Sequence, residues 1–368
     1  MYLFDKRIIS HFDYLIIIFI LPLILLSHNL ISETNETLAN KQLVYYTISA
    51  VAFVVVLFFP IRGNIRLVPV LYWIGIILLL AVEFAGVTKL GAKRWLSIPF
   101  IDLTIQPSEL FKPVFILMLG YLIQNKPPKK DGYDLKDFIY YSFYILLPFV
   151  LIAKEPDLGT ALVLLLVGYG ILFIIGVNWR IWTGILVVMA LASPLIYTNL
   201  IKDYQKKRIK DFLSEQPSYQ VQQSIIAIGN GGVLGKDVED ATQTQLKFLP
   251  IATSDFIFAY FVERHGFFGA FGLILIYGLL IFHLLSMNYF FHDDYVIRTF
   301  ASGLGLLIFL DMSVNILMVI GYAPVVGLPL PMFSYGGSSF INFIVLFAIL
   351  ENLLAFRFMY MYSFERRL

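Results

Sequence analysis

The feature that most constrains this 368-residue chain is a series of long apolar runs. An α-helix needs about 20 apolar residues to cross the hydrocarbon core of a membrane, and about 17 at the short end. Ten stretches are candidate spans, of which the fourth and fifth are short. They are 14–31, 43–59, 67–85, 110–123, 138–153, 157–177, 181–200, 266–287, 296–320 and 338–360.

The composition excludes a soluble globular protein, a disordered chain and a fibre. Hydrophobic residues make up 59% of the chain and charged residues 14%, against about 25% charged in an ordinary soluble domain. The formal charge of +2 is too small to suggest nucleic acid as a partner, and the absence of cysteine excludes a disulfide framework or a thiolate nucleophile. We therefore predict an all-α polytopic membrane protein that forms a single integral membrane domain over residues 1–368.

The basic residues favour one orientation of the bundle. Ten spans place both termini on the same side. With the N-terminus inside, 13 of the 27 basic residues are cytoplasmic, and seven of the other 14 lie in the long connection 201–254. Long connections follow the positive-inside rule poorly, which leaves 13 inside against seven outside. We expect cytoplasmic N- and C-termini and an extracytoplasmic loop over 201–254, between the seventh and eighth spans.

A basic group nevertheless falls on the outer side, in and beside one short connection. It comprises Lys89, Lys93, Arg94 and Lys112. Basic residues on this face oppose insertion, so an anionic ligand at the outer membrane surface would explain them. The structural alternative is a solvated loop with spare charge.

Two acidic motifs open the fourth and sixth spans. Glu109 and Lys112 are three residues apart and share a helix face, with Pro107 suited to the first turn. They form either an ion pair that closes the helix mouth or a polar cavity wall in which Lys112 faces phosphate. Asp157 is placed to cap the sixth span, which does not exclude a site role for Asp157 or Glu155.

Asp255 is the strongest candidate for a general base. Residues 255–287 are too long for one span, and the polar cluster 263–265 divides them. We expect a short interfacial or re-entrant helix over 255–262, capped by Thr253 or Ser254. An acid with apolar residues on one side has a raised pKa and is a stronger base. The alternative is an acid that serves only the helix dipole.

Two irregular segments flank the last spans. The segment 229–236 is rich in glycine, but its spacing does not fit a nucleotide-binding loop, so it predicts a turn or a close backbone approach to a ligand. Three prolines over 324–331 forbid a continuous helix. The run from Ser334 to Ser339 then offers amides and hydroxyls at a helix start, as an anion site or as a simple cap.

Several polar residues lie inside apolar spans, among them Glu83, Asp311, Asn315 and Glu351. Such residues usually face the bundle interior. They form either a proton or ion pathway, which is the main argument for a transporter, or structural contacts between helices.

Together these motifs resemble the SEDS family (shape, elongation, division and sporulation). The resemblance covers about residues 10–360, and the motifs occur in the family's order. They are 91–96 (GAKRWL), 106–109 (QPSE) with Lys112, 156–160 (PDLGT), the region of Tyr219, Gln220 and Gln223, 231–236, 255–258 (DFIF), and 329–331 (PLP) before 334–339 (SYGGSS). Val325-Val326-Gly327 favours the branch that serves rod-shape elongation over the division branch.

The resemblance implies ten membrane helices in the bacterial cytoplasmic (inner) membrane, and a peptidoglycan glycosyltransferase that polymerises lipid II. It also implies that the protein acts together with a class B penicillin-binding transpeptidase and other elongation-complex proteins. Asp255 matches the essential aspartate. Substrate-binding positions are Lys93, Arg94, Glu109, Lys112, Asp157, Gln223, Ser334 and Ser338.

The expected reaction is a glycosyl transfer that inverts the anomeric centre. Asp255 takes the proton of an acceptor hydroxyl, and basic residues, with a divalent cation such as magnesium, neutralise the departing diphosphate. A flippase or transporter for the same lipid-linked precursor is the alternative function. A scaffold that only positions other proteins is the third.

Overall fold

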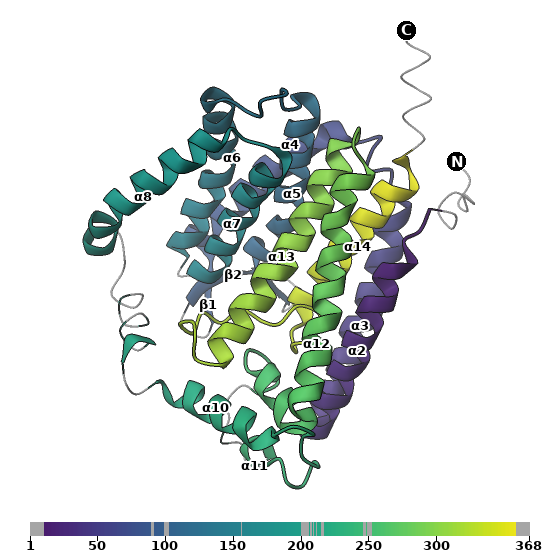
Figure 1. The fold of residues 1–368 in the computed structure, drawn as a ribbon. Coiled ribbons are helices and arrows are strands. Elements are labelled where there is room, and N and C mark those ends of the chain that lie inside the picture. The colour runs from purple at the N-terminus through teal and green to yellow at the C-terminus, as the bar shows by residue number, and fades with distance from the viewer. Residues whose placement is uncertain are drawn as a thin grey trace.

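The computed structural model describes residues 11–89, 92–98, 103–155, 157–199, 217–245 and 252–357, with 206, 208, 210, 212–214 and 248. It is a helical bundle with a small sheet at one end (Figure 1). The elements of the bundle are α2 (Tyr14–Thr34), α3 (Glu36–Phe58), η1 (Ile65–Leu67), α4 (Val68–Ala85), α5 (Pro107–Asn125), α6 (Leu135–Lys154), α7 (Leu158–Ile175), α8 (Trp179–Asn199), α12 (Ile257–Phe290), α13 (Tyr295–Val319) and α14 (Gly337–Ala355).

Each of the ten predicted spans coincides with a helix, which confirms the all-α polytopic class. Within the described ranges, eight helices are long and apolar enough to cross a membrane; α5 and α8 are not among them. The total of ten crossings therefore stays a prediction. Parts of the predicted motifs, spans and loop lie outside the described residues: Gly91, Pro156, Leu200, 358–360 and most of 201–216.

Helix α13 occupies the middle of the bundle and packs against α5, α7 and α12, while α14 packs against α3. Small residues allow the close approach. A Cβ on Gly303 of α13 would lie 2.7 Å from the Ile116 side chain of α5, so these two helices pack at a distance that only a small residue permits. Outward faces are apolar, as with Phe84, which is 83% exposed, and Phe282, which is 73% exposed. Such a surface requires hydrocarbon around it.

The described start and end of the chain meet at one end of the bundle. The backbone N–H of Asp13, before α2, donates to Oε2 of Glu351 in α14 at 3.0 Å. The sheet and helices α10 (Tyr219–Gly231) and α11 (Thr242–Gln245) lie toward the opposite end (Figure 1), here called the loop end. This arrangement agrees with the expectation that both termini lie on one side.

The sheet was not predicted from the sequence. It contains β1 (Val87–Lys89), β2 (Ala92–Ile98) and β3 (Leu103–Ile105), paired antiparallel in the order β1-β2-β3. It connects the loop ends of α4 and α5. Thr88 of β1 pairs with Lys93 and Val87 with Trp95, so the register shifts at Arg94 of β2, as in a β-bulge.

Candidate active site

Asp255 lies at the loop end, two residues before α12, and its main chain is held by a buried amide. Asn315 of α13 donates from Nδ2 to the carbonyl oxygen of Asp255 at 2.8 Å and to that of Leu328 at 2.7 Å. Asn315 has no exposed surface. One side chain therefore joins α13, the segment before α12 and the proline-containing segment before α14.

The segment before α14 forms a wall beside Asp255. Ser334 donates from Oγ to the carbonyl of Ser254 at 2.8 Å and accepts from the N–H of Leu330 at 2.8 Å. The N–H of Tyr335 donates to the carbonyl of Thr253 at 2.8 Å. Irregular backbone near a membrane persists only when its polar groups find such partners. The predicted site residue Ser334 is thus brought to the Asp255 segment.

The Asp255 carboxylate is half-buried and meets few polar groups. Its Oδ1 accepts from the Ser254 hydroxyl at 2.9 Å, and a Cβ on Gly327 would lie 3.5 Å from its Oδ2. Burial raises the pKa of Asp255, while the Ser254 hydroxyl and the positive charge of Arg94 oppose part of the rise. A partly accessible carboxylate with a raised pKa suits a general base. The predicted cap is wrong: α12 begins at Ile257 and its first turn has no side-chain cap.

Arg94 and Asp157 meet on one side of Asp255. Arg94 Nη1 lies 3.6 Å from Asp157 Oδ2, and Gln106 donates to the same oxygen at 2.9 Å. Asp157 Oδ1 accepts from the N–H of Thr160 at 3.3 Å, which confirms the predicted cap of α7. Arg94 also affects Asp255 electrostatically, so one positive side chain acts on both acids.

A buried ion pair stands where the fourth span begins. Lys112 Nζ is 2.7 Å from Glu109 Oε1, which confirms the predicted pair, and 3.9 Å from Asp311 Oδ2 of α13. The Lys112 side chain is 3% exposed. Two carboxylates thus compensate one ammonium between α5 and α13. Asp311 is accounted for as a partner of Lys112.

Three predicted site residues make none of the contacts described above, within the part of the chain that the structure describes. Lys93 donates from Nζ to the carbonyl of Glu83 at 2.7 Å. Gln223 lies in α10, and Ser338 is exposed in the first turn of α14. Their contacts with substrate stay predictions.

The glycine-rich segment packs against α12. A Cβ on Gly235, which has φ +88°, would lie 2.2 Å from the carbonyl oxygen of Arg264. Phe267 donates its N–H to the carbonyl of Gly232 at 2.9 Å. The close approach predicted for these glycines is therefore to α12, which kinks at Gly266 (φ 64°) as its predicted division requires.

Arg264, in the first part of α12, forms an ion pair with Glu33 of α2 at 2.8 Å. This pair fixes the part of α12 that follows Asp255. Among the described residues, no group of three or more His, Asp or Glu side chains could hold a metal ion. We assign no metal site, and no step below depends on one.

Sequence reasoning missed three residues that hold this site. Gln106 and Gly327 carried no separate signal within their motifs, and Ser254 was considered only as a cap. Asn315 is a polar residue within an apolar span, which predicts a buried partner but does not identify it.

Comparison with known proteins identifies the family of the chain. The family described as cell cycle protein, FtsW/RodA/SpoVE, matches residues 3–358. The chain is 54% identical over 359 residues to peptidoglycan glycosyltransferase MrdB of Helicobacter pylori, covering 98% of this chain and 94% of that protein. It is 35% identical to MrdB of Escherichia coli K12, covering 93% of each.

Two solved structures share the fold. One belongs to a study of how a peptidoglycan synthase complex coordinates polymerization and crosslinking, with a TM-score of 0.81, 25% identity and coverage of 94% of this chain and 98% of that one. The other is the rod shape determining protein RodA of Thermus thermophilus, with a TM-score of 0.71, 24% identity and the same coverage.

Proposed function

The chain belongs to the FtsW/RodA/SpoVE family and is a peptidoglycan glycosyltransferase; from that premise we propose that it polymerises lipid II for cell-wall elongation and rod shape, with Asp255 as the general base. The assignment of the base rests on the surroundings of Asp255. Its carboxylate is half-buried, its main chain is fixed by Asn315, and burial raises its pKa.

The reaction joins two lipid-linked molecules. The sugar 4-hydroxyl of the acceptor attacks the anomeric carbon of the donor, and the bond from that carbon to the diphosphate oxygen breaks. Asp255 receives the hydroxyl proton as the new glycosidic bond forms, and the anomeric centre inverts. Proton removal by a positioned base typically accelerates such a step by about 10²–10⁴-fold.

Arg94 is the residue best placed to stabilise the departing diphosphate. Its guanidinium is 25% exposed and is held on one side by Asp157, which leaves N–H donors for phosphate oxygens. A fixed positive group aimed at developing negative charge lowers the barrier without reorganisation. Lys112 is already compensated by Glu109 and Asp311, and it supports the site by holding α5 against α13.

The protein is integral to a membrane, since several helices have apolar faces that only hydrocarbon would cover. We place it in the bacterial cytoplasmic membrane with both termini cytoplasmic, so that the loop end and the segment 201–254 face outward. The related synthase complex that coordinates polymerization and crosslinking supports a class B penicillin-binding transpeptidase as partner, alongside other elongation-complex proteins.

A flippase for the same precursor is the second candidate. The observation in its favour is the charged group that Lys112, Glu109 and Asp311 form between α5 and α13. Paired charges of this kind also bind helices to one another, which the glycosyltransferase needs as much as a transporter does.

One experiment separates the candidates. The full chain with its transpeptidase partner is given lipid II in detergent, where no gradient exists. We expect glycan polymer from the wild type and from Asp240→Asn, a control at an exposed loop aspartate, and none from Asp255→Asn. Transbilayer movement of lipid II in vesicles, without polymer in either system, would instead establish the flippase.

A further inference from the structure

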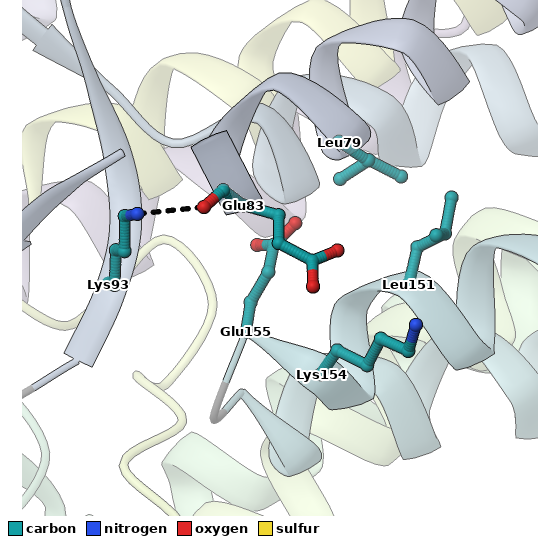
Figure 2. Close-up of a pocket in the computed structure, with 6 residues that line it drawn as sticks. All are labelled: Leu79, Glu83, Lys93, Leu151, Lys154 and Glu155. Atoms are coloured by element: carbon teal, nitrogen blue, oxygen red, sulfur yellow. Dashed lines mark hydrogen bonds between the residues drawn. The ribbon is translucent and has the colours of Figure 1, made fainter. Parts of the chain in front are cut away.

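A pocket lies beside β2, next to Lys93. It has a volume of about 90 Å³ and is lined by Leu79, Glu83, Lys93, Leu151, Lys154 and Glu155. These residues come from the loop ends of α4 and α6 and from β2. Figure 2 shows the two glutamates in the middle, with Lys93 and Lys154 on either side of them.

Glu155 is a buried acid that the proposed reaction does not use. It is 5% exposed, and among the described residues neither of its carboxylate oxygens has a hydrogen-bond partner. Burial raises the pKa of Glu155 to about 8; Asp157 adds to the rise and Arg94 opposes it. At neutral pH the group is therefore mostly a carboxylic acid, which offers one O–H donor to whatever occupies the pocket.

The two lysines supply further donors. Lys93 uses one of its three N–H groups on the carbonyl of Glu83, where a cation also suits the C-terminal end of α4. Lys154 is the last residue of α6 and is exposed. Glu83 is exposed as well, so water screens its carboxylate. The pocket thus presents mainly donors and positive charge.

We propose that this pocket binds a phosphate group of a membrane lipid, with Lys93 and Lys154 as ion-pair partners and the Glu155 carboxyl as a hydrogen-bond donor. Several donors converging from different elements match the several acceptor oxygens of a phosphate. The inference goes beyond the proposed function, because the proposed reaction uses neither Lys154 nor Glu155 of this pocket.

The surroundings favour a lipid over a free anion. The pocket lies between the ends of two helices whose outward faces are apolar, with Ile77 of α4 at 62% exposed and Val150 of α6 at 49%. Acyl chains would lie along these faces while the phosphate stays at the level of the lysines. Basic side chains at this depth recognise lipid head groups in the same way.

A divalent cation is the competing occupant, because an unpartnered carboxylate could take one. Two observations argue against it. Two ammonium groups line the same pocket, and the described residues gather no set of three His, Asp or Glu ligands. A cation would need Glu155 ionised, whereas a phosphate needs it protonated. Replacing Glu155 by Gln should therefore abolish the binding of a cation but preserve the binding of a phosphate.

The test measures lipid binding by native mass spectrometry of the full chain released from detergent. The probes are phosphatidylglycerol, undecaprenyl diphosphate and inorganic phosphate. We expect Lys93→Gln/Lys154→Gln to lower the affinity for at least one lipid probe by about tenfold or more. The control Lys129→Gln, a lysine 76% exposed elsewhere on the surface, should leave that affinity unchanged.

Glu155→Gln is the decisive variant because an amide keeps a donor but cannot ionise. We expect it to retain lipid binding within about threefold, and Glu155→Leu to lose it. Preference for undecaprenyl diphosphate would identify a lipid-linked precursor, and preference for phosphatidylglycerol a bulk phospholipid. Magnesium or calcium binding that Glu155→Gln abolishes, lipid binding unaffected by the double lysine variant, or binding of inorganic phosphate alone would each overturn the proposal.

Discussion

Replacing Asn315 by Leu should slow glycan synthesis without weakening the binding of lipid II. Asn315 donates to the carbonyls of Asp255 and Leu328 at 2.8 and 2.7 Å and touches Asp255 only through its main chain. The variant keeps a side chain of similar size in α13 but removes both bonds. Asp255 would then lose the contact that fixes its position relative to α13.

The expected size follows from the two bonds. Each is worth about 0.5–1.5 kcal/mol net, with an average of about 0.6 kcal/mol in a membrane bundle, so their loss costs about 1–2 kcal/mol. If the displacement of Asp255 adds this whole cost to the free energy of the transition state, kcat falls about 5- to 30-fold. KM for lipid II should change little, because Asn315 faces protein.

The assay measures initial rates of glycan polymerisation against lipid II concentration, with thermal unfolding followed on the same preparations. Asn342→Leu is the matched control: Asn342 is also buried in a spanning helix, but its amide nitrogen has no hydrogen-bond partner in the described part of the chain. An unchanged kcat in Asn315→Leu, or an equal loss in Asn342→Leu, would refute the reasoning.

Three further predictions concern the base, the loop and the buried charges. Because burial raises the pKa of Asp255, kcat should fall on the acid side with a midpoint above the ordinary aspartate value of about 3.9; Ser254→Ala should move that midpoint higher still in a pH–rate profile, since the hydroxyl it removes lowers the pKa. Gly235→Ala should destabilise the protein by about 2–4 kcal/mol, from the left-handed backbone and the contact with a main-chain carbonyl. Gly229→Ala, a helical position with nothing within 4 Å, should be neutral or stabilising by about 0.5–1 kcal/mol; thermal unfolding compares the two, and equal effects would contradict the account of the loop. Lys112→Met should destabilise by about 3–5 kcal/mol because it leaves the buried carboxylate of Asp311 and the partly buried carboxylate of Glu109 uncompensated, and a wild-type melting temperature would show that the pair is not structural.

The helices could be predicted because the membrane imposes their length and apolar composition on the sequence. The limits of the spans were less accurate where polar residues continue a helix, as in α3, which begins at Glu36 rather than near residue 43. The sheet escaped prediction because strands of three residues, such as β1, are too short to show an alternating pattern.

Local contacts of the site were predictable, and distant ones were not. The Glu109–Lys112 pair and the Asp157 cap depend on residues three positions apart, so helix geometry alone implies them. The bond from Asn315 to Asp255 crosses 60 residues. A polar residue in an apolar span signals that a partner exists, but only the packing of α13 identifies which one.

Two expectations depended on residues with two physically reasonable partners. Ser254 could cap α12, but its hydroxyl donates to the Asp255 carboxylate instead. Gly235 could approach a ligand, but it approaches the backbone at Arg264. In both cases composition permits either contact, and the fold of the surrounding segments decides between them.

The central claim, that Asp255 removes a proton during sugar transfer, is tested most directly by a single-turnover rate measured beside lipid II binding on the same samples. Asp255→Asn keeps the size of the side chain but cannot accept the proton. We predict a rate about 10²–10⁴-fold lower with the dissociation constant for lipid II nearly unchanged. A rate close to that of the wild type, in a folded variant that binds lipid II normally, would contradict the account.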